Sequence, residues 1–335
     1  MKVSVVIPVH NKGPYLRACL DSVFAQTFTE FEVIAVDDAS TDDSAQILAS
    51  ITDPRFRWLR TERNVGPGGA AQRAMDAAVG EYIMRVDADD VMFPDRFATQ
   101  VRMLDEDPSL GACSAYVQLM TDPTIIYHVP LDDAACKARL LFGVALNQQV
   151  TAYRREVLVR HDIRFGDDWP HYGEDWMQHL ALARVTRFKN LDRPLAWYRT
   201  GSNNIAHGRD RAKDLRGLYR HVFAHYDIPI TEEQLDLQLY TVKCFPRPIT
   251  ADSVGAYRNW LDALARMDQE RRIFEPVAFQ RQLDKAWYDL LYHLPSNGWG
   301  PVLSYLKRGP RLDRQRSYYL IASLFAGRRT KALRS

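Results

Sequence analysis

The sequence predicts an α/β fold in which a mostly parallel sheet is flanked by helices, followed by a mainly helical C-terminal region. Between residues 3 and 86, strand-length apolar runs alternate with segments of helical periodicity, as in parallel sheets. Residues 3–9 are apolar and rich in β-branched side chains, which is typical of a strand buried on both faces. Beyond residue 211 strand-like runs thin out, and stretches such as 253–269 show helical periodicity.

The predicted elements alternate regularly along the first part of the chain. They are a strand over 3–9, a helix over 14–24, a strand over 31–36, a helix ending near 51, a strand over 56–59, a helix over 66–79 and a strand over 82–86. Pro14 suits the first turn of its helix, where a backbone N–H has no helical partner. Ser40, Thr41 and Asp42 are candidate caps of the second helix.

The length of 335 residues suggests two domains, or one large domain with an appendage. We place the boundary near residue 210, with an α/β domain over 1–210 and a helical region with a basic tail over 211–335. Residues 301–335 contain nine Lys or Arg and one acid, Asp313, so this segment carries a charge of +8 in a chain of net charge +2. This asymmetry indicates a partner with negative charge.

Polar residues follow three of the predicted strands. His10-Asn11 ends the first, Asp37-Asp38 the second and the segment 87–90 the fourth. Since ligands of parallel sheets bind beyond the carboxyl ends of the strands, these side chains are expected at one binding edge. Asp87 and Asp89 repel each other unless a cation lies between them. Mg²⁺ takes one or two protein carboxylates together with substrate phosphates, so the pattern predicts a metal and phosphate site.

A series of short motifs resembles the family 2 glycosyltransferases, inverting enzymes of the GT-A fold that use nucleotide diphosphate sugars. Each motif is modest, but their order and spacing together are specific. They occupy residues 5–11, 22–27, 36–42, 64–66, 80–83, 87–90, 94–96 and the pair Glu174-Asp175. The resemblance spans residues 3 to about 200 and implies a GT-A-type, Rossmann-like catalytic domain over 1–210.

The resemblance also implies roles for individual residues. Nucleotide binding is expected from Pro8, Asn11, Asp38, Asp87 and Ala88. A Mn²⁺ or Mg²⁺ ion is expected on Asp89 with help from Asp87, and His207 is a candidate third ligand. Asp175 is the expected general base that takes the proton of the acceptor hydroxyl. Residues 147–153 and 169–172 are candidates for lining the acceptor site.

Two departures from the family pattern bear on these roles. Many members carry Ala-Arg-Asn where this chain has Ala70-Ala71-Gln72, with Arg73 following. Many members also carry a histidine at the position of Gly201, and here the nearest one is His207. Two other functions fit parts of the pattern. Segment 87–90 also fits the nucleophile loop of haloacid-dehalogenase-like phosphatases, although that loop normally follows the first strand, and the fold also serves non-catalytic modules that bind nucleotide sugars.

The resemblance implies two partners: a nucleotide diphosphate sugar donor, for which it favours a UDP-sugar, and a saccharide or lipid-linked acceptor of bacterial surface polysaccharide or glycolipid assembly. No nucleic acid partner is expected. The apolar stretch 317–327 is flanked by basic residues and is too short to span a bilayer, so it predicts peripheral contact with an anionic membrane. The four cysteines have no short paired spacing, which favours a reducing compartment. We therefore expect a cytoplasmic protein with peripheral contact at the inner face of the cell membrane.

Overall fold

The computed structural model describes residues 1–166, 172–201, 208–309 and 313–325. The chain divides into two compact units. The N-terminal unit comprises Met1–Leu140 and Val144–His207, and the C-terminal unit comprises Leu141–Gly143 and Gly208–Ser335.

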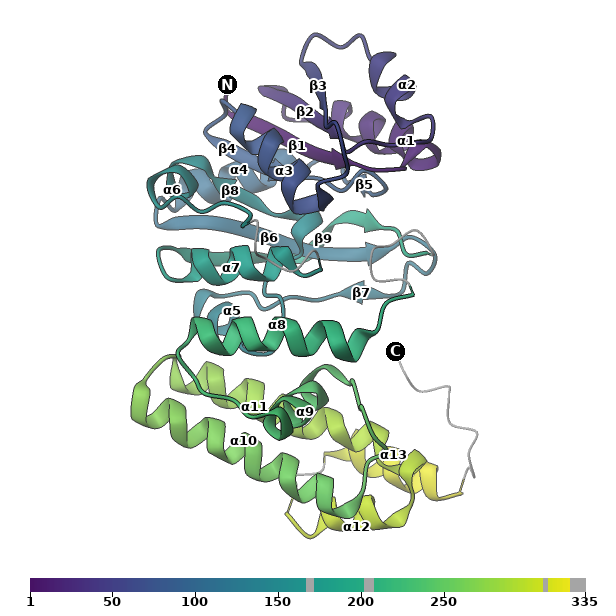
Figure 1. Cartoon of the computed structure of the whole chain (residues 1–335), viewed down its shortest axis with the longest axis vertical. Helices are drawn as coiled ribbons and strands as arrows, with labels where there is room; N and C mark the ends of the chain where they lie inside the picture. Colours follow the sequence, from purple (N-terminus) through teal and green to yellow (C-terminus); the bar gives the residue numbers. More distant parts are fainter. Residues whose placement is uncertain (167–171, 202–207, 310–312, 326–335) are drawn as a thin grey trace. The chain divides into compact units, whose positions relative to one another are not determined.

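A nine-stranded sheet forms the centre of the N-terminal unit (Figure 1). Eight strands lie in the order β3-β2-β1-β4-β8-β6-β9-β5, and β7 pairs with β6. Strands β3, β2, β1 and β4 are mutually parallel, whereas β8 runs antiparallel to both β4 and β6. The strands are β1 (Val3–Val9), β2 (Phe31–Asp37), β3 (Phe56–Arg60), β4 (Tyr82–Arg85), β5 (Val91–Met92), β6 (Leu110–Leu119), β7 (Ile126–Tyr127), β8 (Ala152–Arg154) and β9 (Arg187–Tyr198).

Helices flank this sheet, with α3 packed on β1 and β2 and α4 packed on β6. The helices of the unit are α1 (Gly13–Phe24), α2 (Ser44–Ala49), α3 (Gly66–Ala77), α4 (Arg96–Glu106), α5 (Asp133–Arg139), α6 (Arg155–Arg160) and α7 (Glu174–Ala183), with one 3₁₀ turn, η1 (Gln148–Val150). The predicted α/β class is confirmed. All of β2 and all but one residue of β1 are buried, as their continuous apolar runs predicted.

The predicted caps of α2 were wrong in detail. The helix begins at Ser44, and a carboxylate oxygen of Asp42 accepts a hydrogen bond from the Ser44 N–H at 3.0 Å. Ser40 and Thr41 instead bond to Asn11: the Ser40 hydroxyl accepts from the Asn11 N–H at 3.0 Å, and Asn11 Oδ1 accepts from the Thr41 N–H at 2.8 Å. These bonds tie the end of β1 to the end of β2.

The C-terminal unit is built from helices, and it contains no strand among its described residues. Its elements are α8 (Arg211–His225), α9 (Glu232–Gln238), α10 (Ala251–Arg271), α11 (Pro276–Leu290), α12 (Trp299–Leu306) and α13 (Arg314–Phe325), with 3₁₀ turns η2 (Leu239–Val242), η3 (Leu291–His293) and η4 (Pro295–Asn297). The long helix α10 packs against α11 and α12 (Figure 1). Aromatic side chains fill the interior, including Trp287 stacked on Tyr305 with ring centroids 4.5 Å apart.

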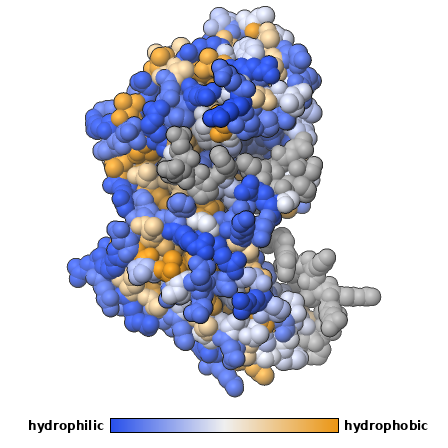
Figure 2. All heavy atoms as spheres, in the orientation of Figure 1, coloured by the Kyte–Doolittle hydropathy of each residue, from blue (hydrophilic) through white to orange (hydrophobic). Residues whose placement is uncertain are grey.

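The segment Leu141–Gly143 joins the C-terminal unit through buried hydrogen bonds. Gln238 Nε2 donates to the Leu141 carbonyl at 3.0 Å, and the Tyr219 hydroxyl donates to the Phe142 carbonyl at 2.9 Å. The surface in view in Figure 2 is mostly hydrophilic in both units, with apolar residues showing in smaller patches. Within the described parts of the chain, no helix is both long enough and apolar enough to cross a membrane.

Candidate active site

The ends of β1 and β2 form one wall of the candidate site. Pro8, within β1, lies in register with Val36 of β2. Asn11 adopts a left-handed backbone with φ of 52°, a conformation that asparagine tolerates better than most residues. His10 Nδ1 donates to the Asp38 carbonyl oxygen at 2.7 Å. The structure therefore brings the predicted nucleotide-binding residues Pro8, Asn11 and Asp38 to adjacent strand ends.

Asp38 is buried and its carboxylate already accepts three hydrogen bonds. Oδ1 accepts from the Thr61 hydroxyl and from the Val65 N–H, both at 2.9 Å, and Oδ2 accepts from the Gly66 N–H at 2.9 Å. The residue thus fixes the segment 61–66 at the start of α3. A contact between Asp38 and the nucleoside stays a prediction.

The segment 87–90 forms a tight turn after β4, in which the Asp90 N–H donates to the Asp87 carbonyl at 3.1 Å. Its three carboxylates have different surroundings. Asp87 Oδ1 lies 3.1 Å from Arg85 Nη2, and Asp89 forms an ion pair with Lys12. Asp90 is fully buried. Its Oδ1 accepts from the Arg199 N–H at 2.8 Å, while its Oδ2 has no hydrogen-bond partner.

The electrostatics of this turn reflect burial and mutual repulsion. Burial, followed by the charges of Asp87 and Asp89, raises the pKa of Asp90 well above its ordinary value. The pKa of Asp87 is also raised, by its enclosed surroundings and then by the charge of Asp89, while the charge of Arg85 acts in the opposite direction. Because 36% of the Asp87 side chain remains exposed, we expect solvent to moderate this shift. A bound cation would relieve the repulsion.

Carboxylate oxygens are suitable ligands for a hard divalent cation, but these carboxylates do not form a complete metal site on their own. Among the described residues, no group of three or more His, Cys, Asp or Glu side chains is arranged to hold a metal ion. Two carboxylates suffice where a diphosphate supplies the remaining oxygen ligands. The raised pKa of Asp90 and its unpartnered Oδ2 indicate that this turn holds more carboxyl groups than the protein's own cations and donors satisfy. The candidate ligand His207 lies outside the described residues. The donor set therefore fits Mg²⁺ or Mn²⁺ held jointly with a substrate.

Arg85, the last residue of β4, belongs to the same site and was not singled out from the sequence. Its side chain is 7% exposed, and its Nε and Nη1 atoms are buried without hydrogen-bond partners. Its carbonyl oxygen accepts a hydrogen bond from Arg96 Nη2 at 2.7 Å, which holds the strand end in place. A charged residue within the otherwise apolar run 82–86 was the signal that could have identified it.

Glu174 and Asp175 begin α7, after Gly173 with φ of 83°. Asp175 Oδ1 accepts from the Trp176 N–H at 2.8 Å. Burial raises the pKa of Asp175, and the charge of Asp87 raises it further while Arg85 opposes both. Burial and then the charge of Asp175 raise the pKa of Glu174 to about 7. The structure thus brings the predicted base into the electrostatic reach of Asp87 and Arg85.

A buried polar cluster lies close to Asp175 and Arg85, whose charges both act on the Tyr153 hydroxyl. That hydroxyl donates to Gln148 Oε1 at 2.6 Å and lies 3.4 Å from His179 Nε2. Burial lowers the pKa of His179 to about 3, so this imidazole is neutral at physiological pH. The backbone N–H of Asn147, at the start of the predicted acceptor segment 147–153, donates to the Ser114 hydroxyl at 3.0 Å, and its Nδ2 donates to the Ala115 carbonyl at 2.8 Å. Trp169 lies outside the described residues.

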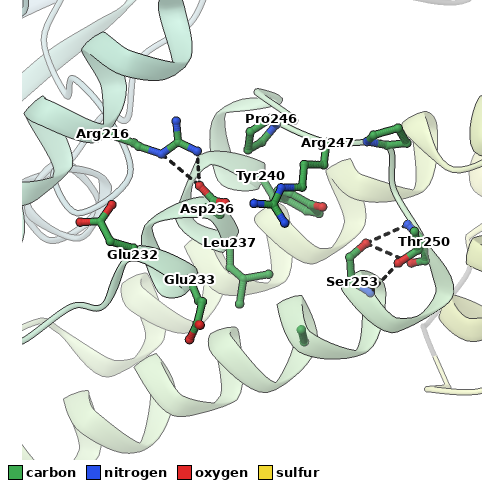
Figure 3. A pocket seen from close by; sticks show the side chains of 12 residues that line it. Arg216, Glu232, Glu233, Asp236, Leu237, Tyr240, Pro246, Arg247, Thr250 and Ser253 are labelled. Atoms are coloured by element: carbon green, nitrogen blue, oxygen red, sulfur yellow. Dashed lines mark hydrogen bonds and ion pairs between the residues drawn. The ribbon is translucent and has the colours of Figure 1, made fainter.

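A separate hollow of about 990 Å³ lies in the C-terminal unit (Figure 3). Tyr240 and Leu237 line it together with Arg247 and the ion pair between Arg216 and Asp236. Thr250 and Ser253 at its edge form the capping box of α10. None of the predicted nucleotide, metal or base residues lines this hollow. We therefore place the candidate active site in the N-terminal unit in spite of the size of this hollow.

Comparisons with known proteins agree with this geometry. Residues 4–160 match the model of the family described as glycosyl transferase family 2. An uncharacterized glycosyltransferase of Escherichia coli, YibD, is 30% identical over 203 residues, which cover 55% of this chain and 59% of YibD. The chain thus spans less than two thirds of the length of this relative.

Two solved structures share the fold at low sequence identity. TarS residues 1–349 of S. aureus, in complex with UDP-GlcNAc, has a TM-score of 0.55 at 19% identity and covers 91% of this chain and 89% of that one. The mannosyltransferase PcManGT of Pyrobaculum calidifontis, in complex with GDP-Man and Mn²⁺, has a TM-score of 0.52 at 19% identity and covers 96% and 86%. The family match places residues 4–160, which include the strand-end carboxylates, in glycosyl transferase family 2, and the two solved structures show that the chain has the GT-A fold.

Proposed function

We propose that this protein is an inverting glycosyltransferase that moves a sugar from a nucleotide diphosphate onto an acceptor hydroxyl. The observation that carries the proposal is that Asp38 and Glu174, the neighbour of Asp175, both contact the start of α3: Asp38 Oδ2 accepts from the Gly66 N–H at 2.9 Å, and a Cβ at Gly68 would lie 3.0 Å from Glu174 Cγ. The influence of the Asp87 and Arg85 charges on the pKa of Asp175 agrees with this placement. A phosphate- and metal-binding strand end and a carboxylate base therefore share one site. The match of residues 4–160 to glycosyl transferase family 2 favours this function over the phosphatase alternative.

Asp175 acts as the general base. Its raised pKa makes it a stronger proton acceptor than an ordinary aspartate. As the acceptor oxygen forms its bond to the anomeric carbon, Asp175 takes the hydroxyl proton and the bond from that carbon to the diphosphate breaks. This single displacement inverts the anomeric centre. Tyr153 and His179 pack nearby without supplying a second base, since His179 has a lowered pKa and the pKa of Tyr153 is raised by burial.

Asp87 and Asp89 would hold the divalent cation, which when bound neutralises charge on the leaving diphosphate. The pair between Lys12 and Asp89 keeps a positive group at this position in the free protein. Asp38, Asn11, Pro8 and Ala88 surround the expected place of the nucleoside. Arg85, whose Nη2 lies 3.1 Å from Asp87 Oδ1, also carries buried, unpartnered N–H groups at Nε and Nη1, and we assign them to an anionic or hydroxyl group of the donor.

The donor is proposed to be a UDP-sugar, because TarS binds UDP-GlcNAc and has the same fold. PcManGT binds GDP-Man, so the fold alone does not determine the nucleotide. The acceptor is proposed to be a saccharide or a lipid-linked saccharide of surface polysaccharide or glycolipid assembly, following the resemblance of the motifs.

The proposal is tested by incubating the protein with UDP-, GDP- and dTDP-sugars in Mn²⁺ and measuring release of the nucleotide diphosphate, with and without simple saccharide acceptors. NMR of the product then gives the anomeric configuration. Asp175→Asn should lose transfer, whereas Asp192→Asn, a matched change at an exposed aspartate, should keep it. Retention of the donor's anomeric configuration would contradict the mechanism.

A further inference from the structure

Exposed apolar side chains gather on two consecutive helices of the C-terminal unit. Among the described residues, α12 and α13 contribute five of the fourteen large apolar side chains that are exposed. Three of the five lie on α12, where Trp299, Leu303 and Leu306 are 58%, 52% and 38% exposed. The spacing of four and then three residues puts them on one side of the helix. A gathering of this kind marks an interaction surface, whereas single exposed apolar residues are common.

Other residues of the same helices attach them to the unit. On α12, Val302 and Tyr305 are buried, and Tyr305 stacks on Trp287. On α13, Leu320 is buried, and the Tyr319 hydroxyl donates to the Tyr292 carbonyl at 2.8 Å. The exposed stripe of α12 is therefore not needed to build the core. In the predicted membrane segment 317–327, Leu320 is therefore part of the interior of the unit and does not face a membrane.

Cations directly follow the apolar stripe. Lys307 is exposed and forms no ion pair with any described residue. Arg308 Nη1 donates to the Ser304 carbonyl at 2.7 Å, which orients its guanidinium along a groove of about 640 Å³ between α10 and α12. Gly255 of α10 permits this approach, because a Cβ there would lie 2.5 Å from Arg308 Nη2. Lys307, Arg308 and Leu303 thus line one groove, which Asp252 also lines.

We propose that the stripe of Trp299, Leu303 and Leu306, with Lys307 and Arg308, seats this protein peripherally on an anionic lipid bilayer. Apolar side chains enter the interfacial region, where tryptophan is favoured, and the adjacent cations meet lipid phosphates. The eight residues of α12 are too few to span a bilayer. A second copy of the chain is a poorer occupant, since two such faces would bring like charges together. The inference does not depend on the transferase activity.

Flotation of the full chain with vesicles tests this surface. We expect binding to vesicles of phosphatidylcholine mixed with phosphatidylglycerol, loss of binding in about 1 M salt, and no binding to phosphatidylcholine alone. Replacing all three stripe residues (Trp299→Ser, Leu303→Ser, Leu306→Ser) should lower the partition coefficient by at least about tenfold, since each buried apolar group contributes to interfacial binding. Val277→Ser is the matched control, because Val277 is 56% exposed on α11 of the same unit and should leave binding unchanged.

The charged half of the surface is tested by Lys307→Gln with Arg308→Gln, both exposed residues. Each lost cation should weaken binding to anionic vesicles about fivefold at low salt. Circular dichroism melting confirms that the variants fold. The proposal is overturned if the wild type stays soluble with anionic vesicles, or if the stripe and control variants float alike. It is also overturned if light scattering shows a dimer that the stripe variant disrupts, because the stripe would then belong to a subunit interface.

Discussion

Arg85 Nη2 lies 3.1 Å from Asp87 Oδ1, at the point where β4 ends and the candidate metal-binding turn begins. Arg85 is enclosed, with 7% of its side chain exposed, and its Nε and Nη1 have no partners. A buried unpaired donor costs about 1–3 kcal/mol. Arg85 thus has N–H groups without hydrogen-bond partners when no substrate is present.

We therefore predict that Arg85→Met weakens donor binding by about tenfold or more, because the variant loses charge-assisted hydrogen bonds worth about 1.5–3 kcal/mol. Since the charge of Arg85 lowers the pKa of Asp175, its loss should move the acid limb of the pH–rate profile to higher pH. Calorimetry with the donor and pH–rate profiles measure the two effects. Arg193→Met, which breaks an exposed pair with Asp95, should change neither. An unshifted acid limb would argue against coupling between Arg85 and the base.

The parallel half of the sheet could be predicted from sequence because buried parallel strands give continuous apolar runs. Strands β1 to β4 lie within a residue or two of their predicted limits. The antiparallel strands β5, β7 and β8 have two or three residues each, so no periodicity identifies them. They become strands only through pairing with distant segments, as Val91 does with Trp197. The assignment of Leu141–Gly143 to the C-terminal unit is equally non-local.

The candidate site could be predicted where its residues are consecutive in the sequence, as in 87–90. It could not be predicted where a role depends on a buried side chain having no hydrogen-bond partner in the protein. Arg85 is visible in the sequence as a charge within an apolar run, but its burial and its missing hydrogen-bond partners are known only from the structure. Ser40 and Thr41 have the composition of helix caps, but Asn11, brought beside them by the pairing of β1 with β2, takes their hydrogen bonds.

Nucleotide binding should depend on a divalent cation and on Asp89. Without metal, the carboxylates of 87–90 repel a diphosphate, and among the described residues Lys12 is the cation that pairs with Asp89. We expect UDP to bind in calorimetry with Mn²⁺ and to lose at least about tenfold in affinity in EDTA or in Asp89→Asn, comparable to other losses at metal sites. The exposed Asp192→Asn serves as the control. Equal affinity with Mn²⁺ and with EDTA would remove the metal from the donor site.

Asp175→Asn should abolish transfer while leaving donor binding close to that of the wild type. Loss of a general base lowers the rate by about 10²–10⁴-fold. Glu174→Gln should have a smaller effect, because the adjacent position on α7 points in a different direction and its Cγ packs toward Gly68. Single-turnover rates and calorimetry separate the two steps. Turnover near the wild-type level in Asp175→Asn would require another base.

Asp38→Ala should release the segment 61–66. Three donors, from Thr61, Val65 and Gly66, lose their acceptor in a buried location. The local free energy of opening should fall by about 3 kcal/mol, which corresponds to the loss of a charged acceptor. Hydrogen exchange of a peptide covering 61–68 measures this opening. Asp53→Ala, which removes a pair with Arg55, should leave that peptide unchanged.

The stability of the free protein should fall with rising pH because of Glu174. Its pKa in the folded state is about 7, against an ordinary value of 4.5, mainly because of burial and then the charge of Asp175. Between these values the folded state keeps a proton that the unfolded state has released. The contribution of the protonated form is therefore complete below about pH 4.5 and is lost as pH rises through about 7.

Glu174→Gln should remove this dependence, since glutamine mimics the protonated acid and does not titrate. Allowing for partial solvent exposure, we expect the variant to gain about 1–2 kcal/mol over the wild type between pH 5 and pH 8. Thermal melts of both proteins without metal or nucleotide measure the gain. Glu62→Gln, at an exposed position on the same unit, should show the same pH dependence as the wild type. A wild type and a Glu174→Gln variant with parallel stability curves would mean that Glu174 is already ionised in the folded protein at pH 5.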